Sequence, residues 1–131
     1  MDVHATGTFE VTATPEPAAP DVLFARLRIA KRFAGDLDAT SAVEMMSAMT
    51  PVKGSAAYVA LERVEGTLAG RRGSFLLHHT GVMDRGRPTL AIAVVPDSGT
   101  GALAGLTGTM SIEIANGVHR YAFAGAIPGD A

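Results

Sequence analysis

The sequence predicts an all-β protein: a closed, antiparallel up-and-down β-barrel of about eight strands, forming one domain over residues 1–131. Segments that alternate apolar and polar residues recur at near-regular spacing and are joined by short turns, and no segment has a clear helical pattern. Consecutive hairpins without long crossovers favour a barrel over a sandwich. Glycines within the strands suit the sharp bends of a closed barrel: Gly7, Gly81, Gly108 and Gly125.

The first two strands are predicted from strict alternation. Residues 4–14 place Phe9 and other apolar residues on one face and threonines on the other, as in a half-buried strand. Residues 22–33 alternate apolar residues with arginines, which favours a strand over the helix that their Leu and Ala content would also permit. Lys31 interrupts the apolar face of this second strand, and Gly35-Asp36 predicts the turn after it.

The middle of the chain contains one ambiguous segment and one long hairpin. Residues 40–50 are compatible with a short helix or a strand, and their methionines are typical of an adaptable core. Residues 54–83 read as two long strands that turn through residues 66–70 and form one wall of the barrel.

The C-terminal part is predicted to hold three further strands. Residues 90–95 read as a strand buried on both sides, and residues 110–114 alternate again. The glycine-rich loop at 97–101 lacks the lysine and following helix of a phosphate-binding loop, so it is expected to be a tight connection. Asn116-Gly117 is a strong hairpin signal, and the last strand spans residues 119–127.

Composition excludes several classes of function. The formal net charge of −2 lacks the basic excess that nucleic-acid binding requires. The absence of cysteine excludes disulfides and thiolate chemistry, and the four scattered histidines do not suggest a metal site. Without a signal peptide or an apolar span, we expect no membrane association and a cytoplasmic location. Aromatic residues make up only 5%, which favours a barrel lined by small side chains that leave a cavity.

Several stretches together resemble one bacterial family. They include two long segments, GSAAYVALERVEGTLAGRRGSF at 54–75 and VVPDSGTGALAGLTGTM at 94–110. ATGTFEV at 5–11, the turn at Asp36 and the closing H-x-Y-x-F at 119–123 add to them. The chain is similar over nearly its whole length to the family called domain of unknown function three-two-two-four.

This resemblance implies an allene-oxide-cyclase-like β-barrel but no settled reaction. The wider fold class includes allene oxide cyclases, dirigent proteins and polyketide cyclases, which by analogy raises the expectation of a cyclase or isomerase. The chain departs from the family pattern at His78, Ala102 and Gly125, where the family has glutamine, glutamate and a large aromatic residue. An inward-facing Gly125 would then open volume in the barrel, or its surroundings would repack around it.

Five ionisable residues on apolar strand faces are candidates for proton transfer. Lys31 either pairs with Glu44 or Glu62 inside the barrel or extends to water from the end of its strand. Glu62 and Tyr58 share a face and would serve as base and hydrogen-bond donor if that face is inward, although the opposite face is equally apolar. His79 shares a face with apolar residues and is either a satisfied core histidine or the best general acid/base in the chain.

A second set of residues is predicted to contact a bound molecule. His119 and Tyr121 begin the last strand, and this suggests a place near the barrel rim. Met46 would supply a soft contact, and Phe75 shares the face of His79. Gly125 would widen the cavity.

The resulting hypothesis is an enzyme that holds a small, mostly apolar organic molecule in the barrel and catalyses a cyclisation or isomerisation without a cofactor. The first alternative is a non-catalytic, lipocalin-like binding protein with the same cavity. A fully packed, structural barrel is the second alternative. We also expect a homo-oligomer that associates through the barrel wall or edge.

Overall fold

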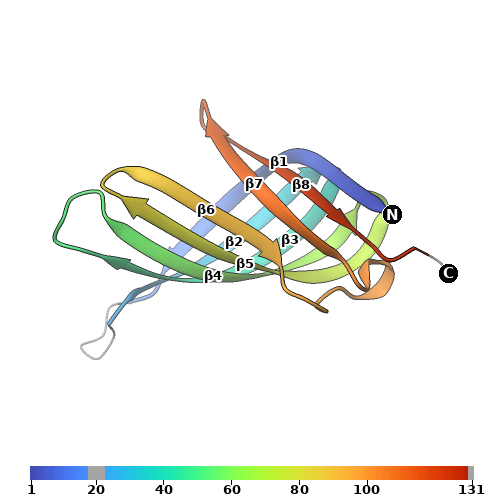
Figure 1. The fold of residues 1–131 in the computed structure, drawn as a ribbon, viewed down its shortest axis with the longest axis horizontal. Coiled ribbons are helices and arrows are strands. Elements are labelled where there is room, and N and C mark those ends of the chain that lie inside the picture. Colours follow the sequence, from blue (N-terminus) through green and yellow to red (C-terminus); the bar gives the residue numbers. More distant parts are fainter. Residues whose placement is uncertain (18–22, 130–131) are drawn as a thin grey trace.

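The structure is a computed structural model that describes residues 1–17 and 23–129. Eight antiparallel strands pair in chain order, and β1 also pairs with β8, so that the sheet closes into a barrel (Figure 1). The predicted fold class is therefore confirmed. Val22, the first residue of the predicted second strand, lies outside the described residues. The strands are β1 (Asp2–Pro15), β2 (Ala25–Gly35), β3 (Leu37–Met49), β4 (Ala56–Leu68), β5 (Arg71–Asp84), β6 (Arg87–Val94), β7 (Thr107–Ala115) and β8 (Val118–Ala126).

Three of the hairpins turn through two residues with positive φ. These turns are Ala69-Gly70, Arg85-Gly86 and Asn116-Gly117, each with φ between 48° and 88° at both positions. Two consecutive positive φ angles match the right-handed twist of the flanking strands, and glycine adopts the second without strain. The turn predicted at Asn116-Gly117 is confirmed for this reason.

Two predicted segments are resolved or corrected by the fold. Residues 40–50, compatible with helix or strand, belong to β3, where alternate residues from Leu37 to Val43 are buried. The prediction that residues 90–95 are buried on both sides is wrong. On β6 only Ile92 and Val94 are buried, while Leu90 is 42% exposed. Alanines occupy the outward positions 91 and 93, so this part of the sequence lacks the polar alternation that would have marked its outer face.

One end of the barrel is filled with side chains, and we call it the packed half. Its core includes Phe33, Leu68, Phe75 and other apolar residues that are almost completely buried. The loop between β6 and β7 contains a short 3-10 helix, η1 (Gly101–Leu103), whose Leu103 is buried in the same core. The connection predicted as a glycine-rich turn therefore plugs this end of the barrel.

The opposite end, which we call the open half, is not filled. Inward-facing residues of β2, β3 and β4 are only partly buried there, and Met83 and Leu90 are more than a third exposed. The pairing of β6 with β7 is limited to Ile92 with Met110 and Ala93 with Thr109, whereas β7 and β8 share nine pairs. Figure 1 shows the tips of the β5–β6 and β7–β8 hairpins pointing apart at this seam.

Candidate functional site

A cluster of four polar side chains lies inside the barrel, between the packed and open halves. It is formed by Lys31 of β2, Ser41 of β3, Glu62 of β4 and His79 of β5. The register pairs Lys31 with Ser41 directly and places Glu62 and His79 on neighbouring strands of the same inner face. Strand alternation thus directs all four inward, although they are distant in the sequence.

The carboxylate of Glu62 is the centre of the cluster. Its Oε1 accepts hydrogen bonds from Lys31 Nζ at 3.2 Å and from His79 Nε2 at 2.7 Å, and its Oε2 accepts one from Ser41 Oγ at 2.5 Å. Glu62 is completely buried, and the other three side chains are nearly so. Lys31 Nζ also lies 5.1 Å from the ring centroid of Phe9, a cation–π contact that further compensates the buried charge.

Two opposing effects act on the pKa of Glu62. Burial is the largest and raises the pKa, because it disfavours the charged form. The hydrogen bond from His79, the charge of Lys31 and the hydrogen bond from Ser41 lower it, and together they prevail. The pKa of Glu62 therefore lies below its ordinary value, and the group is an ionised hydrogen-bond acceptor at neutral pH.

This ionisation determines which nitrogen of His79 carries a proton. An ionised carboxylate only accepts hydrogen bonds, so Nε2 of His79 donates to Glu62. No hydrogen bond joins Nδ1 to another described residue, and among these residues no fully occluded polar side-chain atom lacks a partner. Nδ1 is therefore not fully occluded, and it is the ring nitrogen that Glu62 leaves free to accept a hydrogen bond.

A cavity of about 320 Å³ occupies the open half, and none of the four cluster residues is part of its lining. Most of its lining comes from inward-facing, apolar positions of β3 to β6. His79 lies two residues deeper along β5 than Gly81, which lines the cavity. The principal lining side chains are Met45, Ser47, Ala56, Tyr58, Met83 and Leu90.

Tyr58 lies across the wall of this cavity. A Cβ atom added to Gly81, its partner on β5, would lie 2.0 Å from the Tyr58 ring, so the ring rests directly on the glycine backbone. Burial raises the pKa of Tyr58, which keeps its hydroxyl protonated and able to donate a hydrogen bond.

Replacing Gly81 with alanine is expected to displace the Tyr58 ring and to destabilise the protein by about 1–3 kcal/mol, as overpacking does. The near-ultraviolet circular dichroism of tyrosine should weaken, since the chain has only two tyrosines and no tryptophan. Gly129→Ala is the matched control, because a Cβ there meets nothing within 4 Å. Equal melting temperatures and spectra for both variants would contradict the contact.

The structure brings four predicted residues to this region and leaves one out. Lys31, Glu62 and His79 form the cluster, and Tyr58 lines the cavity beside it. The expectation that Lys31 either pairs inside the barrel or reaches water is resolved in favour of Glu62 as its partner. Glu44 is exposed on the outer face of β3, so its pairing with Lys31 is wrong.

The residues predicted to contact a ligand lie elsewhere. Met46 is on the outer face of β3, because strand alternation directs Met45 inward. Phe75 and Tyr121 belong to the packed core. The Tyr121 hydroxyl is not at a rim: it accepts from Leu37 N at 2.8 Å and lies 3.0 Å from the carbonyl oxygen of Ala34.

His119 and Gly125 complete this set. His119 is half-buried with its ring centroid 5.1 Å from that of Phe9. A Cβ added at Gly125 would lie 2.0 Å from the carbonyl oxygen of Thr107, so the glycine permits close approach of β7 and β8. The expectation that Gly125 opens volume in the barrel is therefore wrong.

Sequence reasoning missed most of the cavity lining. Ser47, Met83 and Leu90 were not selected, because apolar and small residues occur on both faces of these strands. Ser41, the fourth member of the cluster, was also missed. The register with Lys31 would have revealed it, but a single sequence does not give the register.

The described residues contain no group of three or more histidine, aspartate or glutamate side chains placed to share a metal ion. The same part of the chain has no helix that is long and apolar enough to cross a membrane.

Comparison with known proteins identifies relatives of this chain without assigning an activity. The family model described as protein of unknown function (DUF3224) matches residues 5–124. The chain is similar to a crystal structure of a protein of unknown function from this family, from Shewanella oneidensis MR-1. The two are 47% identical with a TM-score of 0.90, and the match covers 98% of this chain and 100% of the other. No curated protein matches. The chain, with its eight-stranded barrel, belongs to the DUF3224 family.

Proposed function

We propose that this protein binds a small, mostly apolar organic molecule in the open half of its barrel. The observation that carries the proposal is the cavity of about 320 Å³, lined by inward-facing apolar side chains of four adjacent strands. Its volume falls within the range of small-molecule sites, and such sites combine apolar walls with a few polar groups that fix orientation. The hydroxyls of Ser47 and Tyr58 supply those groups at the wall.

The division of the barrel supports binding over the fully packed alternative. Only one half is filled by core residues, while Met83 and Leu90 in the other half expose apolar surface on the inner face. Exposed inner apolar surface has a free-energy cost in water that a bound apolar molecule relieves.

Binding is tested with N-phenyl-1-naphthylamine, an uncharged dye that fluoresces in apolar surroundings. We expect saturable binding to the wild-type protein. In Ala56→Trp the indole fills the cavity, and affinity should fall about tenfold or more, a loss of about 1.4 kcal/mol. Ala122→Trp is the matched control, since this exposed alanine lies on the outside of β8. Native mass spectrometry of protein taken directly from cells would also reveal a co-purified molecule.

Three outcomes decide this proposal. Saturable binding that Ala56→Trp weakens and Ala122→Trp leaves unchanged supports it. Equal binding by all three proteins places the dye elsewhere, and no binding by any of them, together with an empty barrel in native mass spectrometry, favours a structural role.

A second candidate function is cofactor-free isomerisation or cyclisation, and the Glu62–His79 hydrogen bond favours it. A carboxylate that accepts a hydrogen bond from one imidazole nitrogen orients the ring and sets its tautomer, so the other nitrogen is available as a general base. Glu62 itself accepts three hydrogen bonds and is completely buried, so His79 is the better candidate for contact with a substrate. Tyr58 would then hold a carbonyl or hydroxyl oxygen of the substrate.

The base is tested with 5-nitrobenzisoxazole, a small apolar compound that opens its ring when a base removes its carbon-bound proton. We expect His79→Ala to lower the rate by about 100-fold, the usual contribution of a positioned general base. His78→Ala is the matched control, because His78 is exposed on the opposite face of β5. A rate that does not change in His79→Ala rejects the catalytic role and leaves the binding role standing.

A further inference from the structure

The outer wall formed by β3, β4, β5 and β6 has an unusual composition. The outward positions of β1 are mainly threonine, as expected for a strand face in water. On β3 to β6 several outward positions are instead apolar and exposed, and we call the outer surface of these four strands the outer β3–β6 wall. Its principal residues are Met46, Ala57, Val59, Leu61, Val82 and Ala91.

These residues adjoin one another across the strands. The register pairs Met46 with Val59 and Ala57 with Val82, while Leu61 and Val59 are 61% and 55% exposed. The apolar residues thus form a patch around the outer face of β4, bordered by Glu44, His78 and Thr80, and such a patch on a folded chain marks an interaction site. Its alanine positions leave the sheet flat enough for another sheet to pack face to face, about 10 Å away.

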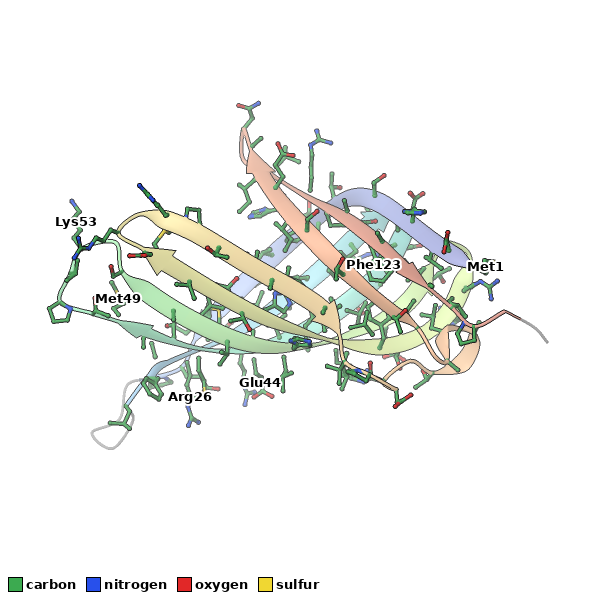
Figure 2. The ribbon with its side chains drawn as sticks, in the orientation of Figure 1. Met1, Arg26, Glu44, Met49, Lys53 and Phe123 are labelled. Carbon is green, nitrogen blue, oxygen red and sulfur yellow. The ribbon has the colours of Figure 1, made fainter. Side chains whose placement is uncertain are left out.

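A groove of about 490 Å³ on this wall carries the charged residues that indicate the partner. Its lining includes two basic residues of β2, Arg26 and Arg28, and two acidic ones, Glu16 and Glu44. Glu16 pairs with Arg28 within the chain at 2.9 Å, whereas no salt bridge between described residues involves Arg26 or Glu44. Figure 2 shows Arg26 and Glu44 projecting from the same outer side of the barrel. A membrane surface or nucleic acid would require a basic excess, which this balanced set does not offer.

We infer that the outer β3–β6 wall is the interface through which two copies of this chain form a dimer. A second copy presents the same apolar centre and the same balance of arginine and glutamate, so the surface is complementary to itself when two copies meet about a twofold axis. Burial of Val59 and Leu61 supplies the apolar centre of the interface, and Arg26 and Glu44 supply its charged rim. This inference does not depend on the proposed binding function.

The test is sedimentation equilibrium of the full chain at up to about 100 µM, where a dimer with a micromolar Kd is formed. We expect the wild-type protein at twice the 13.5 kDa mass of one chain. Leu61→Glu should weaken the dimer by about 30-fold or more, the effect of a central interface residue. Ala57→Glu is a second, smaller change to the same wall, and circular dichroism confirms that each variant is folded.

Ala122→Glu is the matched control, because it introduces the same charge at an exposed alanine on the opposite side of the barrel. A dimer that this variant retains and that Leu61→Glu and Ala57→Glu lose supports the inference. Wild-type protein that sediments as a monomer overturns it. A dimer that all three variants retain also overturns it and places the contact elsewhere on the barrel.

Discussion

Replacing Glu62 with glutamine is expected to lower the free energy of unfolding by about 3–5 kcal/mol, because it removes one partner from a buried ion pair. Lys31 would keep its charge inside the barrel without the carboxylate that compensates it, and His79 would lose its acceptor. Urea denaturation followed by circular dichroism measures the change. Glu65→Gln is the matched control, since its salt bridge with Arg63 is exposed and should contribute less than about 1 kcal/mol.

The double variant Lys31→Met with Glu62→Gln separates a lost ion pair from general disruption. Removing both charges should recover much of the stability, because an uncharged pair needs no compensation in the barrel. A Glu62→Gln protein as stable as the wild type would contradict the buried pair. A double variant less stable than Glu62→Gln would show that Lys31 contributes through its apolar stem instead.

The same carboxylate sets a pH dependence of stability. The folded-state pKa of Glu62 lies below its ordinary value of 4.5, so its ionisation stabilises the folded protein fully above that value. This contribution is lost as the pH falls through the lowered folded-state pKa. Urea midpoints measured from neutral pH into this acid range should fall more steeply for the wild type than for Glu62→Gln. Parallel curves would show that folding does not change the pKa of Glu62.

Truncating Leu103 in the loop between β6 and β7 is expected to destabilise the protein by about 2–5 kcal/mol, as for other buried leucines. Its side chain is 1% exposed in the packed half, and the loop is held to β5 by Ser98 Oγ, which accepts from Leu76 N at 3.0 Å. This loop is therefore part of the core. Leu103→Ala should still bind the naphthylamine dye under conditions in which the variant is folded.

Leu90→Ala removes the same atoms as Leu103→Ala, but we expect it to affect dye binding more than stability. Leu90 lines the cavity of the open half and is 42% exposed, so its truncation should cost less than about 1 kcal/mol of stability. It should nevertheless weaken dye binding several-fold, by about 1 kcal/mol of lost apolar contact. Equal effects of the two truncations on stability and on binding would contradict the division of the barrel into a packed and an open half.

The strands and their turns were determined by local features of the sequence. Alternation in residues 4–14 and the dipeptide Asn116-Gly117 are decided by the pleat and by backbone conformation, which depend on neighbouring residues alone. Closely spaced hairpins then leave few topologies besides a barrel meander. The fold class could therefore be predicted from the sequence alone.

Which face of each strand points into the barrel was harder to predict from the sequence, and β3 and β4 show why. Apolar residues occupy both faces of these strands, so alternation alone does not say whether Glu44 or Met45 points inward, or whether Glu62 does. The dimer inferred above gives a physical reason for the apolar residues on both faces. A wall that packs against a second copy is apolar on its outer face as well.

The sequence by itself determined most of the strands, the hairpin turn at Asn116-Gly117 and an ionisable set on strand faces, and it left residues 40–50 open between helix and strand. Only the tertiary structure decided that Lys31, Glu62 and His79 meet, since that contact depends on the register of β2 to β5 and on closure of the barrel. A shift of one residue in any of these pairings would turn at least one member of the cluster outward. Register is set by the packing of the whole barrel rather than by any one strand.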